Sequence, residues 1–273
     1  RLMANGISGY GLQVGGRGIS STAGSVGSGI RSPVISASDF SQRLVPRDNL
    51  VFWCMCENGS KVKPGVEDNQ NRVSLIRDFS GKGNYLRQSS NSRMPSFATY
   101  NGQKTFLFDG SDISSSPGTS QFDFGTGDFT VILATYAVAQ TGTRATLTNR
   151  AEIGSDGFII GRVDRKWLFG TKDSAGASSL ITSSNHHSVW NVVFARRSGT
   201  SMALQVWTAG SLSEEVSGTK VVRNVDAVQL SIGASLNISN FYSGGVSEAF
   251  VYKKALTTVE QDRILTYLNA KFA

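Results

Sequence analysis

The stretch FDFGTGDFTVILATYA, residues 122–137, contains a glycine-rich turn followed by a long apolar run. Gly125 and Gly127 suit a tight turn, because glycine adopts a positive φ at no steric cost. The run that follows, residues 129–137, is dominated by aromatic and β-branched side chains. This combination predicts a buried β-strand that begins directly after the turn.

Other apolar runs of similar length lie on both sides of this strand. They occupy residues 50–56, 106–110, 158–163, 166–170, 189–195, 202–208, 228–233 and 245–253. Two pairs have hairpin spacing, one turning through Asp164 and Arg165 and the other around residues 197–200. Only 17% of the residues are charged and 30 are glycine, which suits many short strands joined by turns. The pattern predicts an all-β sandwich or barrel.

One helix is predicted at the C-terminus, over residues 257–271. Thr257 and Glu260 have the spacing of a capping box, in which each side chain accepts from the other residue's backbone amide. A helical apolar stripe follows at Ile264, Leu265, Leu268 and Phe272. We expect this helix to pack on the edge of the sandwich.

Residues 1–47 differ from the domain expected over residues 48–273. They are rich in glycine and serine, so ordering them in isolation would cost more entropy than their burial could offset. Apolar residues nevertheless recur along this stretch, beginning with Ile7, Tyr10, Leu12 and Val14. Two interpretations remain open: a solvated leader, or an extended N-terminal arm whose apolar residues contact another chain of an assembly.

Several motifs occur in an order that resembles a known superfamily. They are LVFWC (50–54), DFSGKGN (78–84), RMPSF (93–97), FLFDGS (106–111), the 122–130 turn and strand, and the segment from Glu248 through Phe272. Over residues 50–273 the chain resembles laminin-G-like modules of the concanavalin A-like lectin/glucanase superfamily, of the kind found in phage virion and bacterial surface proteins. The resemblance implies a two-sheet antiparallel jelly-roll sandwich with one C-terminal helix.

The sequence contains no arrangement of residues that is typical of a catalytic site. Glucanases of this superfamily need acids that face the same side of one strand. Glu260 and Asp262 lie in the predicted helix, and Glu214 and Glu215 are adjacent, so on a strand they would face opposite sides. The only histidines, at positions 186 and 187, lack further ligands at zinc spacing. We therefore expect a protein that is not an enzyme.

Calcium is the one cofactor that the resemblance suggests, through loop carboxylates at the rim of the sandwich. Asp109, Asp112 and Asp128 are the candidate ligands, with Asp123 in a similar loop. The dense run of acids typical of a strong calcium site is absent, so the alternative is a module with no cofactor.

Binding of a cell-surface glycan would need an exposed aromatic ring beside polar groups. In the strand 202–208, Leu204 and Val206 share one face, which leaves Gln205 and Trp207 together on the other. A loop or a neighbouring subunit could instead cover Trp207. Trp167 and Trp190 alternate with apolar neighbours and are expected in the core, whereas Trp53 fits either environment.

The formal net charge is +7, but the basic residues are scattered and form no stripe, so no specific nucleic-acid partner is expected. No apolar run approaches the length of a membrane span. The main hypothesis is a structural protein of a virion, capsid-decorating or tail-associated. It would display a lectin-like module and contact other virion proteins and copies of itself. The alternative is a secreted or cell-surface lectin with a flexible linker.

Overall fold

The computed structural model describes residues 44–56, 61–63, 71–100, 102–150, 156–175 and 177–272. The arm contacts expected at Ile7, Tyr10, Leu12 and Val14 lie outside the described residues, as does nearly all of the arm, residues 1–47.

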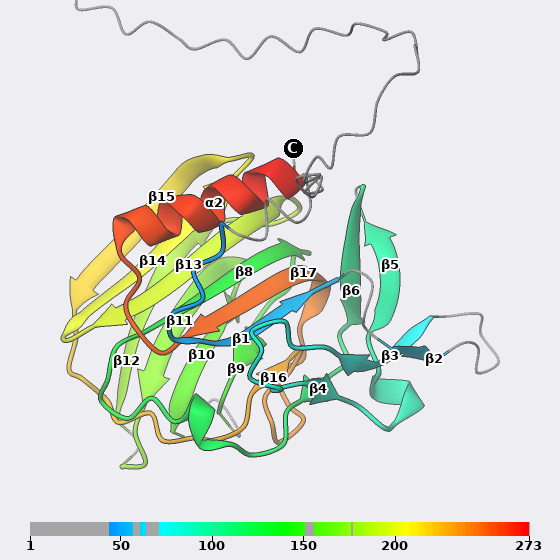
Figure 1. The fold of residues 1–273 in the computed structure, drawn as a ribbon, viewed down its shortest axis with the longest axis horizontal. Coiled ribbons are helices and arrows are strands. Elements are labelled where there is room, and N and C mark those ends of the chain that lie inside the picture. The colour runs from blue at the N-terminus through cyan, green and yellow to red at the C-terminus, as the bar shows by residue number, and fades with distance from the viewer. Residues whose placement is uncertain are drawn as a thin grey trace, which may run out of the picture. The chain divides into compact units, whose positions relative to one another are not determined.

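The described chain consists of short strands, two 3₁₀ turns and one α-helix (Figure 1). The strands are β1 (Leu50–Met55), β2 (Lys61–Lys63), β3 (Arg72–Ile76), β4 (Leu86–Arg87), β5 (Ser96–Tyr100), β6 (Gln103–Asp109), β7 (Ser114–Ser115), β8 (Phe129–Ala137), β9 (Thr143–Thr148), β10 (Gly157–Val163), β11 (Lys166–Lys172), β12 (Ser178–Asn185), β13 (Trp190–Ser198), β14 (Ser201–Thr208), β15 (Ser211–Thr219), β16 (Ser231–Ile232) and β17 (Ser243–Tyr252). The helices are η1 (Asn91–Arg93), η2 (Ser120–Phe122) and α2 (Thr258–Phe272).

Every pairing between these strands is antiparallel, and the pairings form two runs. One run is β15–β14–β13–β8–β17. On the edge of β17 that does not face β8, residues 243–246 pair with β6 and residues 248–252 pair with β1. The other is β12–β11–β10–β9–β16–β7–β4–β3, and β5 links β3 to β6. The prediction of an all-β fold with one C-terminal helix is therefore confirmed.

Strand β8 has the predicted bounds and is buried along its whole length. Phe129, Val131 and Leu133 face a central core, together with aromatic side chains of β6, β10 and β11. Ile132 and Ala134 point the other way, into a second core beneath α2. Because both faces of β8 are covered, its sequence is a continuous apolar run instead of an alternating one.

Both predicted hairpins form. Asp164 and Arg165 connect β10 to β11 with positive φ angles of 45° and 72°, as the twist of a two-residue hairpin turn requires. Gly199, with φ of 54°, connects β13 to β14. The apolar run 228–233 forms only the short strand β16.

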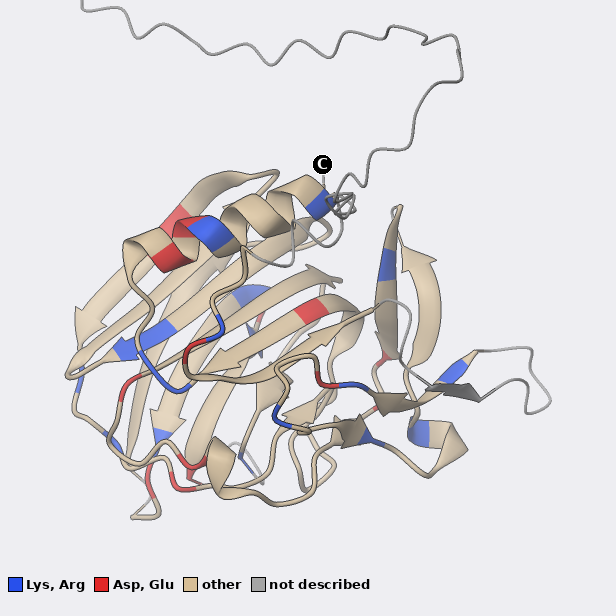
Figure 2. Cartoon of the chain, viewed as in Figure 1, with Lys and Arg blue, Asp and Glu red and all other residues tan. Residues whose placement is uncertain are grey.

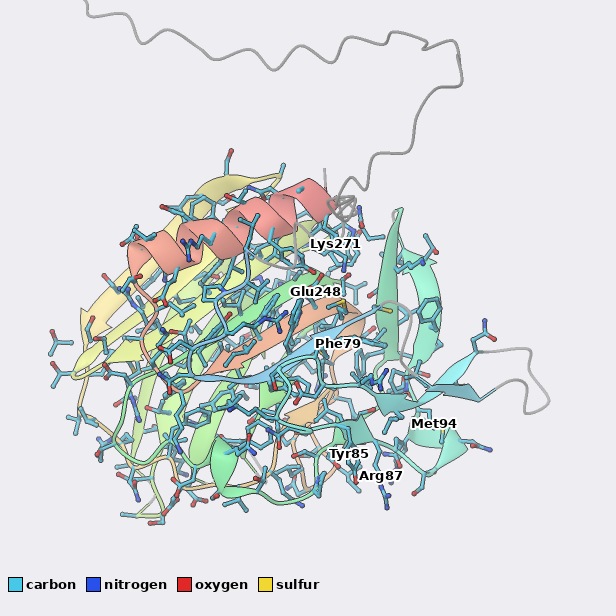
Figure 3. The ribbon with its side chains drawn as sticks, viewed as in Figure 1. Phe79, Tyr85, Arg87, Met94, Glu248 and Lys271 are labelled. Atoms are coloured by element: carbon cyan, nitrogen blue, oxygen red, sulfur yellow. The ribbon has the colours of Figure 1, made fainter. Side chains whose placement is uncertain are left out.

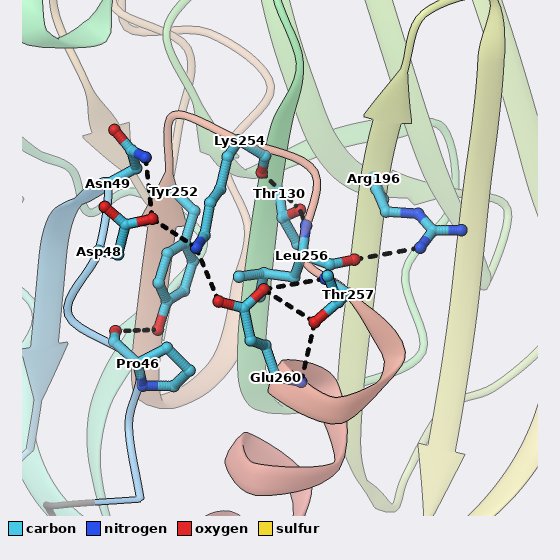
Figure 4. A network of polar contacts seen from close by, with 10 residues as sticks. All are labelled: Pro46, Asp48, Asn49, Thr130, Arg196, Tyr252, Lys254, Leu256, Thr257 and Glu260. Carbon is cyan, nitrogen blue, oxygen red and sulfur yellow. Dashed lines mark hydrogen bonds and ion pairs between the residues drawn. The ribbon is translucent and has the colours of Figure 1, made fainter.

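Helix α2 begins with the predicted capping box (Figure 4). The Glu260 amide donates to Thr257 Oγ1 at 3.3 Å, and the Thr257 amide donates to Glu260 Oε2 at 3.0 Å. Lys254 Nζ binds Glu260 Oε1 at 2.7 Å and Asp48 Oδ2 at 2.8 Å, so the start of the helix is joined to the segment before β1. Within the described ranges, no helix combines the length and apolarity that crossing a membrane demands.

The expected position of α2 on the edge of the fold is wrong, because the helix covers a sheet face. Ile264, Leu265 and Leu268 are buried in the second core, against Trp53 of β1 and Phe250 of β17. Full burial of such side chains contributes about 1.5–3 kcal/mol each. The apolar outer face of β1, β17, β8 and β13 would otherwise be left in water, so the helix lies across it.

The outer strands of the two runs, β12 and β15, are joined by one carboxylate. Glu214 of β15 accepts from the Ser184 amide at 2.8 Å and from Ser184 Oγ at 2.7 Å. His186 Nε2 lies 2.8 Å from the same carboxylate. Glu215, the next residue, is exposed. Side-chain contacts therefore connect the two strands in place of a backbone ladder.

The Lys and Arg residues are spread over strands, loops and α2 in Figure 2 and are not gathered in one stripe. The expectation of no specific nucleic-acid partner stays a prediction.

We expect Glu214→Gln to lower the free energy of unfolding by about 1 kcal/mol at neutral pH, since charge-assisted hydrogen bonds are strong but partial exposure weakens them. Burial opposes ionisation of Glu214, yet hydrogen bonds from Ser184 and His186 outweigh it and lower its pKa below the ordinary 4.5. A lowered folded-state pKa stabilises the fold above the unfolded value, and this contribution is lost as pH falls through the folded value.

The difference between wild type and Glu214→Gln should therefore persist at neutral pH and shrink below pH 4.5, measured by urea unfolding across pH. The control is Glu215→Gln, which removes the same charge from an exposed neighbour. Equal effects of the two substitutions would contradict a specific link between β12 and β15.

Candidate functional site

A groove lies on the outer face of the β13–β14 hairpin, beside the C-terminal end of α2. Its volume is about 430 Å³, and its lining is mainly apolar. We call it the α2 groove, and the residues that line it are Ala134, Trp190, Asn191, Val192, Trp207, Ala209, Gly210, Asn269 and Phe272.

The register of the hairpin brings the two tryptophans to this groove. Val192 of β13 pairs directly with Trp207 of β14, and Trp190 lies two residues along the same face of β13. On the helix side of the groove, Phe272 of α2 stacks on Trp190, with ring centroids 5.6 Å apart and an interplanar angle of 27°. Asn269 lies one helical turn before Phe272, so both side chains reach the same side of the helix.

The polar groups of the groove are incompletely satisfied. Nε1 of Trp190 and Nε1 of Trp207 are buried and have no hydrogen-bond partner among the described residues. The Asn191 amide is already used, since its Nδ2 donates to Val189 O and its Oδ1 accepts from Thr208. Nε1 of Trp167 in the central core also lacks a partner there, and none of these three nitrogens is exposed, so the groove offers a ligand the faces of its aromatic rings and the side-chain amide of Asn269.

A buried charge fixes the end of α2 that forms the groove wall. Glu248 of β17 is fully buried, and its carboxylate accepts from Trp53 Nε1 at 3.0 Å, from Tyr267 OH at 2.8 Å and from Lys271 Nζ. Figure 3 labels Glu248 and Lys271 beneath the helix end. Burial raises the pKa of Glu248, and the Lys271 ammonium opposes that rise. Lys271 directly precedes Phe272, so this ion pair positions the ring that stacks on Trp190.

The predicted pair of glycan residues is only partly brought together. Leu204 and Val206 are buried while Gln205 and Trp207 are half-buried, so the predicted alternation of β14 is confirmed. Trp207 lines the groove, whereas Gln205 does not. The sequence analysis left open whether a loop or a neighbouring subunit covers Trp207. In the structure Trp207 packs against the second core, so α2 supplies part of its cover.

Trp190, Asn269 and Phe272 were not identified as site residues from sequence. The expectation that Trp190 belongs to the core is wrong, since its side chain is half-buried and lines the groove. Trp167 is fully buried as expected, and Trp53 is in the second core. The signal available in the sequence was the alternation of Trp190 with Val192, which places both on one face but does not say what covers that face.

The three predicted calcium ligands do not form one site. Asp109 accepts from the amide and hydroxyl of Ser111, and Asp112 Oδ2 accepts from the Asp109 amide at 3.0 Å. Asp128 instead accepts from the Gly199 amide at 2.7 Å and so stabilises the β13–β14 turn. In the part of the chain that is described, no three acids, histidines or cysteines cluster as metal ligands would. These carboxylates hold turns, which is why they occur in loops.

Burial also changes the chemistry of Asp112, whose side chain is 1% exposed. Its desolvation raises its pKa to about 7, and Arg72 Nη1 at 3.7 Å opposes this rise. Asp112 is therefore a poor calcium ligand near neutral pH, because a half-protonated carboxyl must first lose its proton.

Comparisons with known proteins show the fold of the chain. No protein-family model and no curated protein matches it. Among solved structures, the binding domain of Paraclostridial Mosquitocidal Protein 1 is similar at a TM-score of 0.57 and 16% identity, over 81% of this chain and 52% of that one.

Two botulinum neurotoxin structures are similar to the same degree. A type C structure, described as dependent on two ganglioside molecules for cell entry, matches at a TM-score of 0.57 and 10% identity, over 81% of this chain and 52% of that one. The serotype D ligand-binding domain of botulinum neurotoxin, in complex with N-acetylneuraminic acid, matches at a TM-score of 0.57 and 10% identity. The match covers 83% of this chain and 52% of that one. The chain thus spans about half the length of these structures, and the likeness establishes an all-β antiparallel fold.

We expect Lys271→Met to lower the free energy of unfolding by about 3 kcal/mol, because it leaves the buried Glu248 without its counter-ion. The double variant Lys271→Met/Glu248→Gln removes the buried charge as well and should recover part of that loss. Thermal unfolding monitored by tryptophan fluorescence measures both. A single variant as stable as wild type would show that this ion pair does not hold the helix end.

Proposed function

We propose that the chain is a non-enzymatic, lectin-like module that binds a saccharide in the α2 groove. The observation that supports this most directly is the wall of the groove, which combines the aromatic rings of Trp190, Trp207 and Phe272 with the side-chain amide of Asn269. A pyranose ring offers apolar C–H faces that pack on such rings and hydroxyl groups that can hydrogen-bond to a side-chain amide such as that of Asn269.

The size and lining of the groove fit this class of ligand. A volume of about 430 Å³ lies within the range of small-molecule sites, about 300–1,000 Å³. Such sites combine an apolar lining with a few polar groups, here the side-chain amide of Asn269. The neurotoxin structures with a similar fold were described with a ganglioside or a sialic acid. They support a saccharide as the ligand class, although this chain corresponds to only half of each.

We further propose that the bound saccharide is not turned over. The acids that a hydrolase would use have other roles: Glu248 binds the helix end, Glu260 caps the helix, and Glu214 joins β12 to β15. Ser184 and His186 both contact Glu214, so the carboxylate lies between the two side chains that a nucleophile–base pair would need in contact.

For the fold, we propose the finer assignment that the sequence resemblance implies, a two-sheet jelly-roll sandwich of the concanavalin A-like type. The two antiparallel runs of strands with a core between them support it. For the biological setting, we propose a virion structural protein, capsid-decorating or tail-associated, with residues 1–47 contacting other virion proteins or further copies of the chain. The sequence resemblance supports this setting, and a secreted or cell-surface lectin is the alternative.

We expect Trp207→Phe to weaken saccharide binding about fivefold, because a phenyl ring offers less apolar surface to the sugar than an indole, a loss worth about 1 kcal/mol. A glycan array followed by calorimetry with the best-bound neutral sugar measures this, and a count of reducing ends in the same mixtures tests for turnover. Gln205→Ala is the matched control on the same strand face, outside the groove. Loss of binding in the control, or no saccharide bound by wild type, would contradict the proposal, and new reducing ends would refute the absence of turnover.

The arm has its own test. The described hydrophobic cores consist of residues from Leu44 onward, so a chain without residues 1–40 should keep the melting temperature of the domain. We expect the same deletion to abolish incorporation into the parent assembly, because the apolar residues of the arm would supply the contacts. Incorporation is measured by sedimentation of assembled particles, and normal incorporation of the truncated chain would favour the secreted lectin.

A further inference from the structure

A second pocket, of about 370 Å³, lies where β4 meets β7 and shares no residue with the α2 groove. The lining of this pocket is mainly polar, whereas the lining of the α2 groove is mainly apolar. The residues that line it are Tyr85, Arg87, Gln88, Ser89, Ser115, Ser116 and Pro117, and none of them is an acid. Figure 3 labels Tyr85 and Arg87 near each other at β4.

Strand register explains why Arg87 points outward here. In β4, Leu86 is buried and Arg87 is exposed, as alternation along a strand requires. Arg87 pairs with Ser115 of β7, so the two side chains stand next to each other on the same face. Tyr85, whose side chain is 37% exposed, precedes the strand and offers its ring beside them.

Part of the pocket is fixed by internal hydrogen bonds. Gln88 Nε2 donates to Ile113 O at 3.0 Å, and Gln88 Oε1 accepts from the Ser89 amide at 2.9 Å. Ser116 Oγ accepts from the Leu230 amide at 2.9 Å. These bonds anchor the wall to neighbouring loops, so Gln88 and Ser116 form a preorganised frame.

The remaining polar side chains of the pocket are free to bind. The Arg87 guanidinium, the Tyr85 hydroxyl and the Ser115 hydroxyl make no hydrogen bond or ion pair within the described part of the chain. Some arginines of the fold are instead engaged in structural contacts, since Arg197 donates to Gly125 O and Arg223 O, and Arg223 pairs with Asp173. The pocket thus presents a planar cation without a counter-ion.

We infer that this pocket binds an acidic saccharide, with the carboxylate of the sugar on Arg87 and its ring against Tyr85. A guanidinium binds a carboxylate through two parallel hydrogen bonds, and the neighbouring serine hydroxyls match the hydroxyls of a sugar. This inference goes beyond the α2 groove, because the site is separate and does not require the groove to be occupied.

The test uses sialyllactose and lactose as probes, because they differ by one acidic sugar residue. Wild type should bind sialyllactose more tightly, and Arg87→Gln should weaken that binding at least tenfold with little effect on lactose. Added salt should weaken it as well, because the contact is an exposed ion pair. Binding is followed by titration NMR, with the Tyr85 ring signals as a local reporter.

Matched variants separate this site from the groove and from simple charge loss. Arg77→Gln removes the same charge from an exposed arginine that does not line the pocket and should have no effect. Trp207→Phe should leave the Tyr85 shifts caused by sialyllactose unchanged, whether or not the groove binds sugar. Sialyllactose affinity retained in Arg87→Gln would overturn the inference. Equal displacement by acetate or inorganic phosphate would show a general small-anion site and would also overturn it.

Discussion

The strand pair β8–β17 is buried on both faces, and the rest of the fold follows from that constraint. Each strand sends alternate side chains into the central core and into the second core under α2. A sheet that is apolar on both faces needs a covering layer on each, since exposing large side chains costs about 1.5–3 kcal/mol apiece. The second run of strands covers one face, and α2 covers the other together with Val45, Phe79 and Leu256.

The groove lies beside the last turn of α2, at the margin of the second core. The helix is 15 residues long and ends at Phe272, which stacks on Trp190. Trp207 and Val192 are only half-buried, and both pack at the margin of the second core. The aromatic wall of the groove is thus the margin of a hydrophobic core that α2 leaves partly open. Lys271, in the last helical turn, is favoured there by the helix dipole as well as by Glu248.

Sequence reasoning succeeded where local signals decide the structure. The apolar run of β8, the turn residues Asp164 and Arg165, and the Thr257–Glu260 capping box act within a few residues, and each formed as predicted. It missed β9, β12 and β15, whose sequences are rich in Ser, Thr or Glu, because their pairing depends on neighbouring strands that no local pattern reveals. It could not place Trp190 in a groove, because that depends on where α2 comes to lie, a helix whose Phe272 is 82 positions later in the chain.

The two candidate sites are stabilised by different contacts, and this difference predicts how local opening of the structure affects binding at each. The α2 groove is formed between a helix and a sheet, so its geometry depends on tertiary packing and on the buried Glu248–Lys271 pair. The second pocket, which contains Arg87, lies where β4 pairs with β7. Hydrogen bonds of Gln88 and Ser116 support its wall. Helix ends open locally at lower free energy than paired strands. The affinity of the groove should therefore depend on how firmly α2 is docked, whereas that of the pocket should depend on the loops that Gln88 and Ser116 hold in place.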